Sequence, residues 1–242
     1  MMTGFKMMVA ALFWAAMPCS AQKPEEPATS QRSKKAVAKV RPALESQLKT
    51  AGFQWGAPVF IRVFKDTRTL EVWLGKENVF KHFQDFDICY FSGKLGPKKA
   101  EGDLQVPEGF YGTGAGAMNP WSSYHLSFNV GYPNHFDRSH GYTGSLIMIH
   151  GNCVSIGCLA MTDPSIEKIY ALVEAALLAG QKTVPVHIFP FLLTDRKLEV
   201  HKDHPAQAFW RELQPGYQYF EEHRLIPKVF VRDRRYQIEP SR

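Results

Sequence analysis

The chain has 242 residues, of which 45% are hydrophobic and 13% aromatic, and its formal net charge is +6 at pH 7. These apolar residues are enough to bury a core in one domain, or in one domain with an extension, without a scaffold of disulfides. The basic residues are scattered or lie in the tails, without a basic stripe interleaved with aromatics, so nucleic-acid binding is not expected. The positive charge favours weak attraction to anionic partners, such as cell-wall polymers or membrane head groups.

Residues 1–21 have the pattern of a secretory signal peptide. Lys6 precedes the apolar run MMVAALFWAAMP, and small residues lead to a cleavage site after Ala21. Pro18 stands before Cys19, where a lipoprotein signal would have a small residue, so a lipid anchor is not expected. The remaining chain has no apolar run of roughly 18 residues, so no transmembrane segment is predicted. The protein is therefore expected to be exported.

The first half of the mature chain is predicted to be mostly strands. Residues 22–40 are polar and charged and are expected to form a flexible leader, with order beginning near residue 41 in a short helix that ends at Gly52. Alternating segments rich in β-branched and aromatic residues predict a hairpin over 58–75 and a third strand over 80–91. Residues 92–120 are rich in glycine and proline and are expected to form a long loop.

The second half adds strands and helices. Strands are predicted over 123–130 and 145–150, separated by a turn-rich loop, and the second of them is buried and ends on His150. A helix is predicted from Asp163, as N-cap, to Gly180. The remaining predicted elements are a buried strand over 184–191, one or two amphipathic helices within 204–224 and a strand over 228–233. The fold class is therefore mainly β (α+β), with helices at its margins: a domain over 41–195 and a helical and strand extension over 196–242 packed on it.

The segment IMIHGNCVSIGCLAMTD, residues 147–163, carries the candidate chemistry. Removal of the signal peptide leaves Cys89, Cys153 and Cys158, and an odd number of cysteines leaves at least one thiol unpaired in a monomer. Cys158 is a candidate nucleophile with His150 as its base, because a free thiol needs a nearby imidazole or helix terminus to favour the thiolate. The backbone N–H groups of Gly157 and Cys158 are the candidate oxyanion hole.

Three other interpretations of the same segment remain open. His150, Cys153 and Cys158 could together bind zinc, although their spacing lacks the usual paired CxxC elements and a clear fourth ligand. Cys153 and Cys158 could form a disulfide, which export encourages. Both could also be small buried residues, an explanation that suits Cys89 in its predicted strand better than a cysteine flanked by glycine.

The residues IHG followed by SIGC resemble the signature of the L,D-transpeptidase catalytic domain (YkuD-type) family. The segment EGDLQVPEGFY (101–111) is similar to the family's upstream Pro-x-Gly stretch, and SFNVGYPNHFDR with GCLAMTD is similar to its narrower YafK-like branch. The resemblance covers about residues 58–190. It implies a YkuD-like β-sandwich or barrel-like core with peripheral helices, and a periplasmic location.

The resemblance implies that Cys158 is the nucleophile, His150 the general base, and the amides of Gly157 and Cys158 the oxyanion hole. Family members attack the L-centre carbonyl of meso-diaminopimelate in peptidoglycan stem peptides, release D-alanine and form a thioester, which an amine or water then resolves. No cofactor and no metal are implied. The protein is thus expected to be a cysteine-dependent L,D-transpeptidase or a related L,D-hydrolase.

Two positions depart from the common family pattern. Ile156 replaces a histidine and Ala160 replaces an arginine, and the loop from His150 to Cys158 is shorter than in most relatives. Both features recur in the YafK-like branch, which favours water as acceptor and a hydrolase that releases a lysine-linked outer-membrane lipoprotein. The third hypothesis is a cell-wall-binding protein without catalysis.

Five further residues are candidate substrate-binding groups. Asn134 and Asp137 could bind polar groups of a stem peptide, although they are also ordinary turn residues. Tyr124 and Tyr132 could line the cleft, although aromatic strand residues are more often core. Ser155 has the simpler explanation of a hydroxyl bonded to local backbone.

Overall fold

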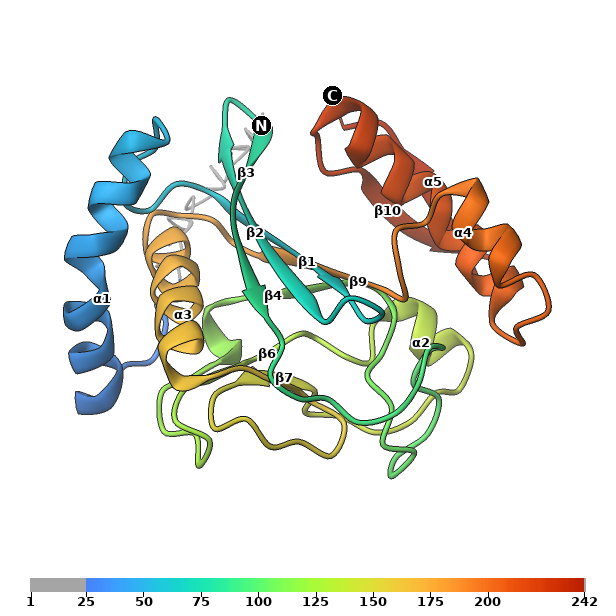
Figure 1. The fold of residues 1–242 in the computed structure, drawn as a ribbon, viewed down its shortest axis with the longest axis horizontal. Coiled ribbons are helices and arrows are strands. Elements are labelled where there is room, and N and C mark those ends of the chain that lie inside the picture. The colour runs from blue at the N-terminus through green and yellow to red at the C-terminus, as the bar shows by residue number, and fades with distance from the viewer. Residues whose placement is uncertain (1–24, 242) are drawn as a thin grey trace, which may run out of the picture.

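The computed structural model describes residues 25–241. Two larger β-sheets lie at its centre with helices on either side, and a third sheet is a two-stranded hairpin (Figure 1). The larger sheet has the strand order β3-β2-β1-β9-β4. Its strands are β1 (Val59–Phe64), β2 (Thr69–Lys76), β3 (Val79–Asp87), β4 (Gly109–Thr113) and β9 (Val184–Phe189). Strands β1 and β9 pair in parallel and the other pairs are antiparallel. The predicted hairpin over 58–75 is confirmed as β1 and β2.

The smaller sheet has the order β5-β6-β7-β8 and holds the candidate site. Its strands are short: β5 (Met118–Asn119), β6 (Ser127–Asn129), β7 (Met148–His150) and β8 (Leu159–Ala160), with the 3₁₀ turn η1 (Ala115–Ala117) before β5. In this sheet only β7 and β8 pair in parallel. The chain leaves β7 after His150, crosses back through the loop that follows, and enters β8 in the same direction as β7. The two sheets share one hydrophobic core, to which β1, β6, β7 and β8 all contribute.

Two long helices, α1 (Gln31–Thr50) and α3 (Asp163–Leu178), pack against each other beside this core (Figure 1). Helix α1 begins at Gln31, capped by Ser30, and buries Ala36 and Val40 in the common core. The prediction that residues 22–40 form a flexible leader is therefore wrong from residue 31 onward. The prediction relied on the polar composition of this stretch. Its few apolar residues, such as Ala36 and Val40, lie at helical spacing on one face, which favours a helix. The predicted signal peptide lies outside the described residues.

The C-terminal segment forms a second layer on the other side of the larger sheet (Figure 1). It consists of α4 (Asp195–Val200), α5 (Gln207–His223) and the hairpin of β10 (Lys228–Arg232) and β11 (Arg235–Glu239). Trp210 and Tyr217 of α5 and Tyr236 of β11 pack with sheet residues in one aromatic cluster. This burial holds the extension on the domain, because fully buried aromatic side chains dominate such contacts.

The fold class is confirmed as mainly β of α+β type, and several elements differ from the sequence prediction. Strand β4 lies within the segment expected to be loop, since its glycines hide the strand pattern. Helices α2 (His135–Ser139) and α4 and strand β11 were also not predicted, because each is only five or six residues long. The N-cap of α3 is Thr162, whose side chain accepts from the Ser165 N–H, rather than Asp163. Within residues 25–241, no helix is long and apolar enough to cross a bilayer.

A buried ion pair ties the long loop between β3 and β4 to the rest of the domain. The Lys65 ammonium lies 2.9 Å from the Glu108 carboxylate, and neither side chain is exposed to solvent. Lys65 also donates to the carbonyls of Gly96 and Val106, and Glu108 accepts from the Trp210 indole N–H at 2.6 Å. Burial lowers the pKa of Lys65, and the Glu108 carboxylate opposes that shift. The pair therefore links β1, the loop and α5 at a point that excludes water.

We predict that Lys65→Met lowers the free energy of unfolding by about 3 to 5 kcal/mol, because it leaves the Glu108 carboxylate buried without its counter-charge. Chemical denaturation measures the change. Lys65→Met combined with Glu108→Gln should recover part of the loss, since no charge is then buried. A loss below about 1 kcal/mol in the single variant would contradict this account.

Candidate active site

The register of β7 and β8 brings His150 and Cys158 to the same face of the smaller sheet. Ile149 pairs with Leu159 and His150 with Ala160, which places Cys158 beside Met148. Side chains alternate along strands, so the fully buried Ile149 and Leu159 point into the core while His150 and Cys158 project from the other face. Strand geometry gives roughly 8 Å between their Cα atoms, a distance that an imidazole and a thiol side chain can bridge.

The His150 ring is held in one tautomer. Its Nδ1–H donates to the carbonyl oxygen of Gly151 at 2.6 Å, which leaves Nε2 with a free lone pair. The residue is 3% exposed, and its ring packs on the Tyr124 ring with a centroid separation of 4.8 Å. Burial lowers the pKa of His150 below its ordinary value, against the opposing effect of the bond to Gly151. The imidazole is therefore neutral near pH 7, as a proton acceptor must be.

Cys158 carries the free thiol of the described chain. Its Sγ accepts a hydrogen bond from the Met148 N–H at 3.4 Å and lies 3.6 Å from the Leu146 carbonyl oxygen. Burial raises the pKa of the Cys158 thiol, while the Met148 N–H and the Lys98 ammonium act in the opposite direction. The resting pair is accordingly a neutral thiol and a neutral imidazole rather than an ion pair.

The turn before Cys158 is built by Ser155 and Gly157. The Ser155 hydroxyl donates to the Cys158 carbonyl and accepts from the Cys158 N–H, each at 2.7 Å. Gly157 has a φ of 129°, a conformation that favours glycine, although a Cβ there would still lie 3.9 Å from the nearest atom. The Cys158 N–H therefore donates to Ser155, whereas the Gly157 N–H has no acceptor within the described residues. An oxyanion hole formed by the amides of Gly157 and Cys158 stays a prediction.

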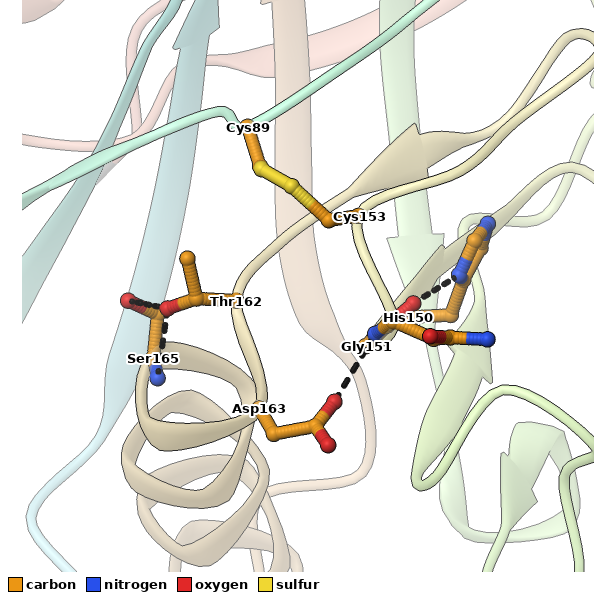
Figure 2. Close-up of a disulfide and its surroundings, with 8 residues drawn as sticks. Cys89, His150, Gly151, Cys153, Thr162, Asp163 and Ser165 are labelled. Carbon is orange, nitrogen blue, oxygen red and sulfur yellow. Dashed lines mark hydrogen bonds between the residues drawn. A yellow bond between two sulfur atoms is a disulfide. The ribbon is translucent and has the colours of Figure 1, made fainter.

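Cys153 forms a disulfide with Cys89, and their Cα atoms are 5.3 Å apart (Figure 2). Cys89 follows the end of β3, beside Tyr90, which makes a bridge with Ala160 of β8. The disulfide thus connects the loop between β7 and β8 to the edge of the same sheet. A Cys153–Cys158 disulfide and a zinc site that includes the Cys153 thiolate are both incompatible with this pairing.

Asp163, at the start of α3, holds the loop between β7 and β8 near the residues that follow His150. The Asp163 carboxylate accepts from the Asn152 N–H at 2.8 Å, next to Gly151 (Figure 2). A Cβ on Gly151 would lie only 2.5 Å from that carboxylate oxygen, so the glycine after His150 is required by close packing. Asp163 therefore anchors the loop that follows His150.

Three of the predicted substrate-binding residues have structural partners. Asn134 caps α2, and its amide donates to the Phe110 carbonyl and the Tyr236 hydroxyl. Asp137 is buried and accepts from the Asn134 N–H, and burial raises its pKa to about 6. Tyr132 is buried and donates to the Thr143 carbonyl at 3.0 Å. A substrate-binding role for these three stays a prediction, whereas Tyr124 lies directly against His150.

The sequence did not point to Lys98, whose charge acts to lower the pKa of the Cys158 thiol. Lys98 and its partner Asp103 lie in the segment PKKAEGD, which reads as an ordinary polar loop. Only the burial of the Lys98 side chain, 6% exposed, distinguishes it from its neighbours, and burial is not visible in the sequence. Within residues 25–241, no group of three or more His, Cys, Asp or Glu side chains is arranged to hold a metal.

Comparison with known proteins shows the family of this chain. Residues 58–188 match the family described as YkuD: L,D-transpeptidase catalytic domain. A protein of two Escherichia coli strains, named "Putative L,D-transpeptidase YafK", is 44% identical over 183 residues, which are 76% of this chain and 74% of that protein. The chain belongs to the L,D-transpeptidase catalytic domain family, as its motif predicted.

Among solved structures, similar chains come from other bacteria. A mutant form of the helical cell shape determining protein Pgp2 from Campylobacter jejuni has a TM-score of 0.47 at 20% identity, over 79% of this chain and 66% of that one. Bd1075 from Bdellovibrio bacteriovorus has a TM-score of 0.40 at 18% identity, over 73% and 78% of the two chains.

We predict that replacing Cys89 and Cys153 together by alanine lowers the free energy of unfolding by about 4 kcal/mol, the loop-closure value for the 64-residue separation of the two cysteines. Turnover should persist in the folded fraction, because neither sulfur is free to attack. Denaturation and an activity assay below the unfolding transition measure both effects. Loss of all activity while the variant is still folded would contradict a purely structural role for this disulfide.

Proposed function

We propose that this protein is an exported cysteine enzyme that acts on peptidoglycan stem peptides through a thioester on Cys158. The observation that carries the proposal is the pairing of β7 and β8. It puts the unpaired thiol of Cys158 on the same sheet face as His150, whose Nδ1–H is already engaged by Gly151. Family membership supplies the reaction class.

The reaction begins from the neutral pair. Nε2 of His150 accepts the thiol proton as Sγ attacks the L-centre carbonyl of meso-diaminopimelate, and the carbonyl oxygen takes up negative charge. The Gly157 N–H is the free donor for that oxygen, and the Cys158 N–H can join it by leaving Ser155. The intermediate then breaks the peptide bond: the amine of the terminal D-alanine leaves with the proton from His150, and the thioester remains.

The second half of the reaction regenerates the thiol. An amine or water loses its proton to Nε2 of His150 and attacks the thioester carbonyl, and Sγ leaves as the new amide or acid forms. An amine acceptor gives a cross-link or attaches a protein to the wall, and water gives hydrolysis. The same two residues thus serve both outcomes, so the acceptor depends on the shape of the site around them.

Hydrolysis of a lysine-linked outer-membrane lipoprotein from diaminopimelate is the second candidate. The side chain of Ile156 is 83% exposed at the edge of the site, and Ala160 is fully buried under the bridge to Tyr90. Neither position offers a charged group to a bound stem peptide. Without a charged side chain at these two positions, the site leaves room for water or for a bulky polypeptide substituent.

Export to the periplasm is supported by two features. Residues 1–21 have the signal-peptide pattern, and the Cys89–Cys153 disulfide is typical of proteins from oxidising compartments. A peptidoglycan substrate lies in the same compartment.

We expect purified protein incubated with muropeptides, with and without a lysine-linked lipoprotein stem peptide, to convert one of them in a way that mass spectrometry detects. New diaminopimelate cross-links would identify a transpeptidase, and loss of the linked lysine would identify a hydrolase. Cys158→Ala should abolish either product, and His150→Gln should reduce it by at least about a hundredfold. Turnover by the native protein no greater than that of Cys158→Ala would instead support a wall-binding protein without catalysis.

The rate should fall on the acid side only below about pH 6.5. Since burial lowers the pKa of His150, its neutral form, the base, persists to lower pH than in an ordinary histidine. Activity is lost as the pH falls through that lowered pKa. A profile of kcat/KM between pH 4.5 and 8 measures it, and an acid limb centred above pH 7 would contradict the assignment of His150 as the base.

A further inference from the structure

The segment of residues 120–125 lies against His150. The Tyr124 ring packs on the His150 ring with a centroid separation of 4.8 Å, and the Tyr124 carbonyl accepts from the Gly151 N–H at 3.0 Å. Tyr124 is 45% exposed, whereas His150 is 3% exposed. The tyrosine ring therefore covers part of the imidazole, and its position affects how much water reaches that ring.

The first turn of α1 holds this segment by its backbone. The Arg32 guanidinium donates through Nη1 to the Ser122 carbonyl at 2.6 Å and to the His125 carbonyl at 2.8 Å. Hydrogen bonds from a charged donor are stronger than those between neutral groups. Because Ser122 and His125 lie on either side of Tyr124 in the chain, Arg32 fixes the backbone both before and after the tyrosine.

The conformation of His125 explains why the segment needs an anchor. Its φ is 68°, in the left-handed region that residues other than glycine rarely adopt, and such a residue persists only where its surroundings hold it. Its Nε2 lies 3.0 Å from the Glu167 carboxylate of α3, which also pairs with Lys39 of α1 at 2.7 Å. The hydroxyl of Ser30, the N-cap of α1, donates to the Pro120 carbonyl at 2.9 Å. Helix α1 and its cap thus contribute to every one of these anchoring contacts.

We propose that Arg32 is a positioning residue of the active site, which keeps the Tyr124 ring against His150 by binding backbone carbonyls on either side of the tyrosine. Arg32 acts on the imidazole through Tyr124 and takes no part in making or breaking bonds. This role rests on the proposed function, in which His150 is the base. Helix α1 lies outside residues 58–188, which match the family, so Arg32 is an addition to the shared catalytic domain.

The titratable groups around His150 do not replace this contact. The Asp163 carboxylate accepts from the backbone of the loop after His150. Both carboxylate oxygens of Glu167 are already paired. Burial raises the pKa of the Cys158 thiol, so it carries no charge near pH 7. In the described part of the chain, Tyr124 is the one aromatic residue whose ring contacts the imidazole.

The test is the titration of the His150 ring, followed by NMR on the folded full chain and assigned by comparison with His150→Gln. Burial lowers the pKa of His150, and a less firmly held Tyr124 ring would admit water to the imidazole. Arg32→Gln should therefore raise the pKa of His150 by about half a unit to one unit. Arg32 is exposed, so the variant buries no unpaired charge and should fold.

Two further variants of α1 separate the hydrogen bonds from the charge. Arg32→Lys keeps a charged donor and should restore part of the difference in the pKa of His150. Lys35→Gln is the matched control, because Lys35 is exposed on the same helix and the variant removes the same charge. Its titration should match that of the native protein.

A double-mutant cycle with Tyr124→Ala shows whether Arg32 acts through the tyrosine. Tyr124→Ala alone should raise the pKa of His150, and adding Arg32→Gln should raise it little further, because the ring that Arg32 holds is then absent. A purely structural role for Arg32 would lower the free energy of unfolding without moving this pKa. An unchanged pKa in Arg32→Gln, an equal rise in Lys35→Gln, or additive rises in the double variant would overturn the proposal.

The titration needs no substrate, so failure of this inference is distinguishable from failure of the proposed function. A His150 pKa that depends on Arg32, in a protein that turns over no muropeptide, would refute the proposed function and leave the contact of Arg32 with the segment as the cause of the shift. Turnover together with a His150 pKa that does not depend on Arg32 would refute the inference alone.

Discussion

The parallel pairing of β7 with β8 is the constraint on which the site depends. Two pairs of residues, Ile149 with Leu159 and His150 with Ala160, bring His150 and Cys158 to the same sheet face. A parallel pair normally needs a long crossover, yet here eight residues connect the strands, so the connection must be held by other means. The Cys89–Cys153 disulfide, the Asp163 carboxylate and the Ser155 hydroxyl each hold one part of it.

Burial determines the protonation states of His150 and Cys158. The loop between β3 and β4 reaches the turn before Cys158, where the Gln105 carbonyl would lie 3.9 Å from a Cβ on Gly157, and Lys65 and Glu108 attach this loop to the core. Desolvation keeps both the imidazole and the thiol neutral at rest. In the proposed reaction, charge develops at this site only when a substrate is attacked. A preorganised donor such as the Gly157 N–H therefore stabilises that charge more than it would in water.

The sequence predicted the parts of the structure that rest on local pattern. The hairpin over 58–75, the buried strand that ends at His150 and the helix after Pro164 all have clear periodicity or capping residues. The candidate pair of His150 and Cys158 was chosen because IHG followed by SIGC resembles the family signature, whereas the residue types alone left a metal site, a disulfide and packing open. The disulfide partner of Cys153 is 64 residues away, and no local pattern identifies it. The leader was misjudged because α1 gains its stability from packing on α3, which composition does not reveal.

The substrate-binding predictions show the same limit. Asn134 and Asp137 were chosen as polar residues in a loop, but that loop contains α2, whose N-terminus they cap. Lys98 was overlooked as one lysine among several, although it is buried and paired with Asp103. Polar residues in loops therefore cannot be sorted into binding and structural roles without knowing which of them are buried.

The central claim is that Cys158 carries the acyl group, and the mass of the intact protein tests it most directly. After brief incubation with a tetrapeptide stem and acid quenching, the account predicts a mass gain equal to the stem peptide without its terminal D-alanine. Digestion should map that gain to Cys158, and hydroxylamine should remove it, as expected of a thioester. A product formed with no adduct on Cys158, or with the adduct on another residue, would contradict the account.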